Sequence, residues 1–122
     1  MAGMEEIVQN LRMELRRGTL VMCVLSQLKE ARYGYSLIQG LTNKGVQIDQ
    51  NTLYPLLRRL EKQGLLDSSW SVDEARPRKY YELNEQGLLV LNSLVKEWSA
   101  MHRTISALLN FEEGDEYDAR LD

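Results

Sequence analysis

The chain has 122 residues, 43% of them hydrophobic and 27% charged, a composition typical of one globular domain that folds without a metal or a disulfide. No apolar run approaches the roughly 20 residues of a membrane-spanning helix, and the N-terminus lacks the basic start and apolar stretch of a signal peptide. We therefore expect a soluble, cytoplasmic protein. The net charge of -3 at first argues against nucleic acid as a partner, because neutralising phosphates requires lysine and arginine.

That charge is unevenly distributed along the chain. Residues 112–122 hold six acids and one arginine, a local charge of -5, which leaves +2 on residues 1–111. The acidic tail has two interpretations: a solvated, mobile end, or a segment that competes with DNA for a basic surface. Nucleic acid therefore remains a candidate partner for the rest of the chain.

The first 45 residues are predicted to form three helices. Apolar residues at three- and four-residue spacing predict an amphipathic helix over about residues 5–16, and the nearly all-apolar residues 20–28 predict a helix at the centre of the core. The sequence Tyr-Gly-Tyr-Ser at residues 33–36 interrupts this pattern. We expect the third helix to begin near Leu37 and to stop before Gly45.

The chain has one cysteine, Cys23, and one histidine, His102. One of each cannot supply the three or four ligands of a zinc site within one chain, so we expect no metal and no cofactor. Because Cys23 lies within an apolar run, its thiol is expected to be a small buried side chain. The alternative, a redox sensor, lacks a basic neighbour that would favour the thiolate.

A fourth helix is expected after residue 48, because Asp49 or Asn51 can cap its free N–H groups. Pro55 would lie in or near the first turn, and Gly64 would end the helix. Its inner stripe is formed by leucines: Leu53, Leu56, Leu57 and Leu60. The opposite side is predicted to carry the polar and basic residues Thr52, Tyr54, Arg58, Arg59 and Lys62.

Two extended runs follow, residues 66–72 and 79–83, with a turn at residues 73–77 between them, and this pattern predicts a β-hairpin. Asn84 then caps a helix over about residues 85–110, which would be roughly 40 Å long at 1.5 Å per residue. One small core does not need so long a helix. Its apolar residues recur in a nearly heptad pattern, so we expect part of this stripe to face a second chain.

The predicted dimer interface combines the first and last helices. It consists of apolar residues: Ile7, Leu11, Leu91, Leu94, Val95, Trp98, Met101, Ile105 and Leu108. Two uses of Trp98 stay open. Its indole either packs within the interface or, together with the partner's indole across a two-fold axis, sandwiches a small flat aromatic effector.

The order of helices and hairpin predicts a helix-turn-helix followed by a wing, with the fourth helix placed to enter the DNA major groove. Polar residues near the start of that helix can bond base edges or phosphates. The hairpin adds Arg76, Arg78 and Lys79, which suit phosphates or a narrow minor groove. Each feature alone also fits a solvated helix face or an edge strand protected by charge. Together they favour DNA binding.

Three stretches resemble the PadR family of bacterial transcriptional regulators, and the similarity covers about residues 17–109. They are YGYSLI at 33–38, NTLYPLLRRLE at 51–61 and RPRKYYELNEQG at 76–87. The resemblance implies a homodimer that binds a palindromic operator, usually to repress a nearby gene, and a short-type member with a single C-terminal dimerisation helix. The expected DNA-binding residues are Tyr33, Tyr35, Asn51, Thr52, Tyr54, Arg58, Arg59, Arg76, Arg78, Lys79 and Tyr80.

The expected fold is mainly α (α+β), a winged helix-turn-helix with a two-stranded wing and a long C-terminal dimerisation helix. We expect a DNA-binding part over residues 1–83, a dimerisation helix over 84–111 and an acidic tail over 112–122. No recognisable catalytic motif is present, so we expect no enzyme. The alternative function is a winged-helix module that binds another protein and no specific DNA.

Overall fold

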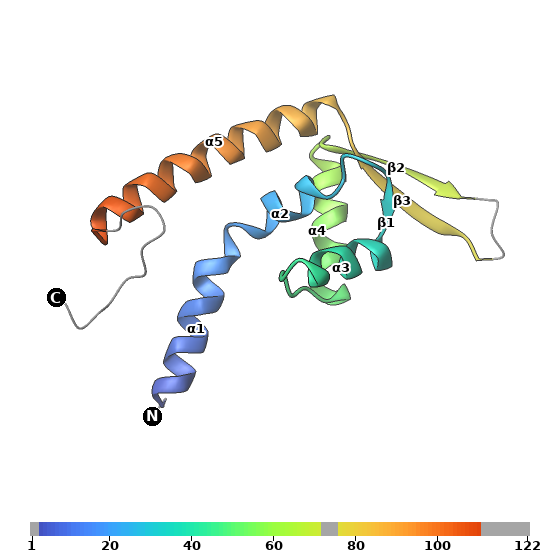
Figure 1. Cartoon of the computed structure of the whole chain (residues 1–122). Coiled ribbons are helices and arrows are strands. Elements are labelled where there is room, and N and C mark those ends of the chain that lie inside the picture. The colour runs from blue at the N-terminus through green and yellow to red at the C-terminus, as the bar shows by residue number, and fades with distance from the viewer. Residues whose placement is uncertain (1–2, 72–75, 111–122) are drawn as a thin grey trace. The chain divides into compact units, whose positions relative to one another are not determined.

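The computed structural model describes residues 3–71 and 76–110 (Figure 1). Most of the turn expected at residues 73–77, and the acidic tail, lie outside these ranges. The chain divides after Leu91 into two compact units, which are described separately. Within the described residues the elements are α1 (Met4–Arg17), α2 (Leu20–Ser26), β1 (Arg32–Tyr33), α3 (Gly34–Asn43), α4 (Gln50–Lys62), β2 (Leu66–Ser71), β3 (Arg78–Leu83) and α5 (Glu85–Leu108). This mainly helical fold with a small sheet confirms the expected winged-helix class.

The first two helices differ in burial, as their sequences predict. No side chain of α1 is buried, and its apolar residues Ile7 and Leu11 are 44% and 58% exposed. By contrast, Val24 and Leu25 of α2 are fully buried. Cys23 is half-buried beside them and is a free thiol. Helix α2 therefore belongs to the core, whereas α1 presents an apolar face that the described residues of its own unit leave exposed.

The third helix begins earlier than the sequence pattern indicates. Residues 35 and 36 belong to α3, which starts at Gly34, so the expected start near Leu37 is wrong. Immediately before it, β1 pairs antiparallel with β3, with Tyr33 opposite Tyr80. This short strand was not expected. It adds a third strand to the hairpin and gives the sheet order β1-β3-β2.

Helix α4 begins and ends on the signals in its sequence. The side chain of Asp49 accepts a hydrogen bond from the Thr52 N–H at 2.9 Å, which makes Asp49 the N-cap. The helix ends at Lys62, and Gly64, which follows the C-cap residue, has a φ of +83° that favours glycine. The Leu65 N–H donates back to the Leu60 carbonyl at 3.0 Å. Pro55 is the sixth residue of the helix and so lies in the second turn, next to the first turn in or near which it was expected.

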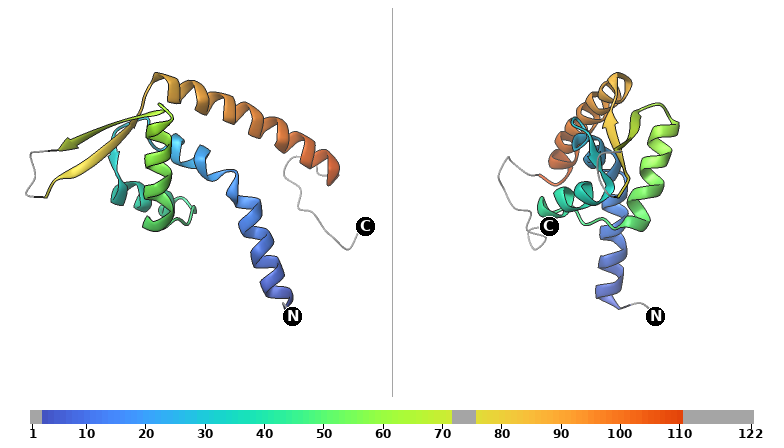
Figure 2. Two further views of the ribbon diagram at one scale, coloured as in Figure 1. Left: turned by 180° about the vertical axis from the view of Figure 1, so that it is seen from behind. Right: turned by 90° about the vertical axis from the view of Figure 1, so that its right-hand side faces the viewer.

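The hairpin is in the predicted place, and Figures 1 and 2 show it extending beyond α4. Strand β2 pairs with β3 from Leu66 opposite Leu83 to Ser71 opposite Arg78. At its base, Leu66 and Tyr81 are buried, and the Leu83 N–H donates to the Leu28 carbonyl at 2.7 Å. Because side chains alternate across a strand, one face of the hairpin packs on the core and the other faces away from it.

Helix α5 begins within the first unit. Asn84 caps it, because its Oδ1 accepts a hydrogen bond from the Gly87 N–H at 2.8 Å while its amide donates to the Gly64 carbonyl at 2.9 Å. A Cβ on Gly87 would collide with the Leu65 carbonyl oxygen, so a residue without a side chain is needed here. The cap and the glycine fix the start of α5 against the end of α4.

The second unit contains the remainder of α5. Its apolar residues Val95, Trp98, Met101 and Ile105 are each 45–50% exposed. Among the residues that the structure describes, no helix is both long enough and apolar enough to cross a membrane.

Candidate nucleic-acid interface

Of the DNA-contact residues predicted on α4, Asn51 and Arg58 lie on the side of the helix that is opposite the core. The leucines at 53, 56, 57 and 60 face the core, at 0–9% exposure. Successive residues of a helix are rotated by about 100°, so the opposite side is made by four exposed residues. We call them the outward face: Asn51, Pro55, Arg58 and Lys62.

Thr52 and Arg59 lie on one flank of α4, beside α2. Both are exposed, and they line an open groove of about 380 Å³ together with Pro55 and Leu56 of α4. The other wall is made by the end of α1 and the start of α2: Arg17, Leu20 and Val21. Thr52 and Arg59 therefore border the outward face and do not form its centre.

Tyr54 lies on the other flank and is half-buried. Its ring packs against the first residue of α3, so closely that a Cβ on Gly34 would lie 2.6 Å from Tyr54 Cζ. Tyr54 therefore joins α4 to the start of α3. This contact accounts for a glycine at position 34 and gives Tyr54 a packing role besides any DNA contact.

Three side chains from β1 and β3 form a packed cluster. The Arg78 guanidinium lies 4.4 Å from the centre of the Tyr33 ring, and the Tyr33 and Tyr80 rings pack in a T-shaped pair with 5.4 Å between centroids. The pairing of β1 with β3 places these side chains on one face of the sheet. The guanidinium of Arg78 therefore lies over the face of the Tyr33 ring, which is the geometry of a cation–π contact.

Two more predicted residues are exposed. Tyr35, in the first turn of α3, is 54% exposed, and its hydroxyl accepts a hydrogen bond from the Gln39 side chain at 3.1 Å. Arg76 is exposed at the end of the hairpin that leads into β3. Both side chains are accessible to a partner.

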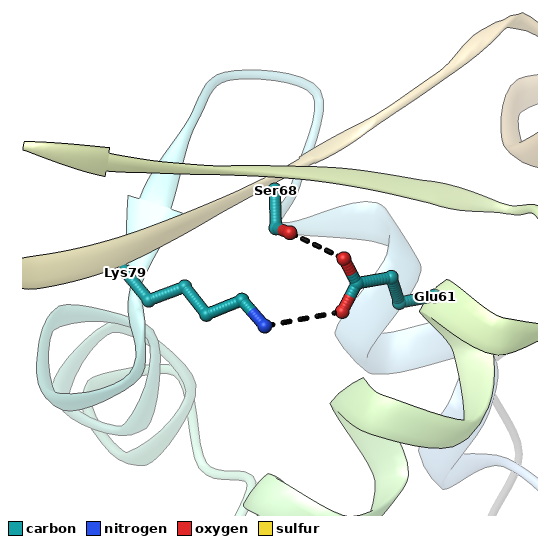
Figure 3. Close-up of polar contacts among 3 residues, drawn as sticks. All are labelled: Glu61, Ser68 and Lys79. Atoms are coloured by element: carbon teal, nitrogen blue, oxygen red, sulfur yellow. Dashed lines mark hydrogen bonds and ion pairs between the residues drawn. The ribbon is translucent and has the colours of Figure 1, made fainter.

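Lys79 is already engaged by α4, as Figure 3 shows. Its Nζ donates to Glu61 Oε1 at 3.3 Å, and the Ser68 hydroxyl donates to the other carboxylate oxygen. The hydrogen bond from Ser68 is the main cause that lowers the pKa of Glu61; burial opposes it, and Lys79 adds to the lowering. Burial alone would lower the pKa of Lys79, but the hydrogen bond to Glu61 and the charges of Tyr81 and Glu61 together raise it.

The sequence reasoning missed Glu61 and Ser68. They come from different elements, and no local spacing signals that they meet. A weak signal was present in the composition of α4, because Glu61 is the one acid among its 13 residues.

The predicted dimer residues are mostly exposed within their own units. Leu11 in α1 and Met101, Ile105 and Leu108 in α5 are at least 45% exposed. Leu91 differs, because it is 4% exposed and already packs inside its own unit. The Trp98 indole stacks on His102 with 5.4 Å between centroids and 11° between planes.

Metal binding has no visible basis in residues 3–71 and 76–110. Within these ranges, no three side chains of histidine, cysteine, aspartate or glutamate gather to hold an ion.

A helix-turn-helix with an exposed polar helix face, followed by a basic hairpin, defines a winged-helix DNA-binding protein. The family model described as the transcriptional regulator PadR-like family matches residues 21–93, which run from α2 into α5. The chain belongs to this family, as the sequence motifs predicted. It is therefore a DNA-binding transcriptional regulator and not an enzyme.

Similar proteins support this assignment. The crystal structure of a PadR family transcriptional regulator from Eggerthella lenta superimposes with a TM-score of 0.82 at 48% identity, covering 91% of this chain and 96% of that chain. A PadR-like transcriptional regulator from Bacillus cereus gives a TM-score of 0.72 at 29% identity, covering 81% and 99%. The transcriptional regulator Rv3488 of Mycobacterium tuberculosis is 39% identical over 59 residues, which are 48% of this chain and 55% of that protein.

Proposed function

We propose that the protein is a homodimeric repressor that binds a palindromic operator. The outward face of α4 enters the major groove, and the hairpin contacts the neighbouring backbone or minor groove. The observation that carries this proposal is the exposed row Asn51, Arg58 and Lys62 on α4. Asparagine can bond adenine edges and arginine can bond guanine edges, whereas lysine suits phosphates.

The wing supplies the second contact. Arg76 is exposed, and the Arg78 guanidinium lies over the Tyr33 ring. Arginine binds phosphate through two parallel N–H groups and is attracted to a narrow minor groove, so both residues suit the DNA backbone. Contacts of this kind position a protein on DNA without reading its sequence.

The apolar stripes of α1 and α5 support a dimer. Side chains such as Leu11, Met101 and Ile105 are 45–58% exposed, and exposed apolar area of this extent usually marks an interface. A two-fold dimer presents two copies of α4 to the same side of a duplex. We expect two half-sites whose centres lie about 10 base pairs apart, one turn of DNA.

A small aromatic effector is a further part of the proposal. Trp98 is 45% exposed, and its indole stacks on the His102 ring. Two such indoles across a two-fold axis suit a planar ligand between them. Because the chain has two tryptophans, Trp70→Phe leaves Trp98 as the reporter. Titration with planar aromatic compounds should quench its fluorescence; no quenching by any of them contradicts an effector at Trp98.

A gel-shift tests the DNA-binding proposal. The purified protein is mixed with DNA from its own promoter region at about 50 and 200 mM salt, with random DNA as competitor. If six to ten phosphates are contacted, the affinity should fall about 10³- to 10⁵-fold between these concentrations. Absence of a specific shift from the folded protein would favour the alternative, a winged-helix module that binds protein.

Repression is tested separately with a reporter gene under the same promoter. Deleting the regulator should raise expression of the reporter, and adding back the Arg58→Ala variant should not restore repression. A fall in expression after deletion would identify an activator instead.

A further inference from the structure

One carboxylate connects the recognition helix to both strands of the wing. Glu61 lies in the last turn of α4, and its two oxygens accept hydrogen bonds from Ser68 of β2 and Lys79 of β3 (Figure 3). Ser68 is paired with Tyr81, and Lys79 with Trp70, so all four side chains lie on one face of the hairpin. That face is the one that packs on the core, because Tyr81 is 4% exposed.

We propose that Glu61 is a positioning residue that fixes the wing to α4 and keeps Lys79 out of the phosphate contacts. The proposal rests on the DNA-binding function proposed above and goes beyond it. It replaces the expected role of Lys79, a phosphate contact, by a role in holding the wing.

The two adjacent cations of β3 have different surroundings. Neighbouring residues of a strand point to opposite faces, so Arg78 and Lys79 cannot both point toward the same surface. Arg78 stacks on Tyr33 on one face, while Lys79 reaches Glu61 on the other. Basic residues that are consecutive in the sequence therefore serve two separate functions.

The contact with Glu61 opposes a phosphate contact by Lys79. Both partners are partly buried, with side chains 32% exposed, and the Ser68 hydroxyl holds the carboxylate in place. A lysine that is already paired with a carboxylate displaces fewer counterions from DNA than an unpaired one. Moving Lys79 to a phosphate would also leave the partly buried Glu61 carboxylate without its cation.

Fixing the wing has a consequence for recognition. With Glu61 in place, α4 and the hairpin act as one body, so the major-groove contacts and the backbone contacts keep a constant separation. Pre-organisation of this kind reduces the ordering required on binding. Glu61 therefore acts on DNA through the residues that it holds and makes no DNA contact of its own.

The test is the salt dependence of binding to a labelled duplex of the protein's own promoter DNA. Fluorescence anisotropy gives the affinity of wild type, Lys79→Ala, Glu61→Gln and the double variant from about 50 to 200 mM salt. Each phosphate contact contributes about 0.9 to the slope of log affinity against log salt. Lys79→Ala should leave the slope unchanged. Glu61→Gln frees Lys79 and should steepen the slope by up to about 0.9 per protomer.

The double variant and two controls complete the design. Adding Lys79→Ala to Glu61→Gln should return the slope to the wild-type value. Arg78→Ala should reduce the slope by about 0.9 per protomer. Glu82→Gln makes the same charge change at an exposed position of β3 and should leave the slope unchanged. A reduced slope for Lys79→Ala alone would overturn the proposal.

A second measurement needs no DNA and separates this proposal from the proposed function. Hydrogen exchange of the backbone amides of β2 and β3 is compared between wild type, Glu61→Ala and Glu82→Ala. If Glu61 holds the wing, only Glu61→Ala should speed exchange there. Equal exchange in all three proteins would overturn the positioning role, even if the protein binds its operator. Absence of DNA binding by wild type would instead overturn the proposed function.

Discussion

Replacing Gly34 by alanine tests the contact between α3 and α4. The added Cβ would lie 2.6 Å from Cζ of Tyr54, about 1 Å closer than ordinary van der Waals contact. Either the ring or the start of α3 must shift. Overpacking of this kind costs about 1–3 kcal/mol of unfolding free energy.

Gly40 offers a matched control in the same helix. A Cβ there meets only Arg32 Nη1 at 3.7 Å, which is ordinary contact. Alanine is favoured over glycine in a helix interior by about 0.5–1 kcal/mol, so Gly40→Ala should be as stable as wild type or more stable. The two substitutions add the same methyl group and are expected to have opposite effects.

Urea unfolding followed by circular dichroism measures both variants. All proteins are compared at one concentration, because the stability of the proposed homodimer depends on it. In a Tyr54→Ala background, Gly34→Ala should lose most of its cost, giving a coupling energy of about 1–3 kcal/mol. The packing contact would be refuted if Gly34→Ala were neutral in wild type, or if its cost were the same in both backgrounds.

Three further predictions concern the cap, the carboxylate and the stacked wing. Asp49→Ala removes the cap of the Thr52 N–H and should cost about 1 kcal/mol in urea unfolding, whereas Asp49→Asn should cost less; equal costs would contradict the cap. The pKa of Glu61 is lowered from 4.5 in the folded protein, so its carboxylate adds stability that is present above pH 4.5 and is lost as pH falls through the lowered pKa. Between about pH 6 and pH 3, the unfolding free energy of wild type should therefore fall more than that of Glu61→Gln, and parallel curves would show that the shift is absent. Tyr33→Ala removes the ring beneath Arg78 and should weaken DNA binding about 2- to 30-fold in anisotropy titrations, while Tyr33→Phe keeps the stack and should bind as wild type; equal loss in both would assign the effect to the Tyr33 hydroxyl.

The helices and the hairpin could be predicted because their signals are local. Spacing of apolar residues predicted the helices, and single residues predicted their ends: Asn84 as the N-cap of α5, and Gly64 as the stop after α4. For α4 the sequence offered Asp49 or Asn51 as the N-cap, and the structure has Asp49. The side chains of Asp49 and Asn84 each accept a hydrogen bond from a backbone N–H three residues later, and Gly64 adopts a positive φ. Such features need no knowledge of the rest of the chain.

The features that were missed depend on contacts between distant residues. Strand β1 has two residues, too few to show an alternating pattern, and it forms because Tyr33 pairs with Tyr80. The start of α3 at Gly34 is fixed partly by the Tyr54 ring, which comes from the next helix. Contacts between residues that are far apart in the chain produce no periodic pattern of apolar residues in the sequence.

The candidate site was predicted as a set of residues but not as an arrangement. Amphipathic spacing separates the inner side of α4 from the rest. It cannot tell that Thr52 borders a groove or that Tyr54 packs on α3. Those distinctions depend on which neighbours stand beside each flank. Glu61 was missed because its hydrogen-bond partners come from both strands of the wing, which are distant from it in the helix pattern.

Hydroxyl-radical footprinting on the protein's own promoter DNA tests the central claim most directly, because it reports both binding and geometry. Wild type should protect two half-sites on one side of the duplex, with centres about 10 base pairs apart. Arg58→Ala, an exposed change on the outward face of α4, should lose this pattern while keeping its fold. Protection that is absent, uniform along the DNA, or unchanged in Arg58→Ala would contradict sequence-specific binding through this face.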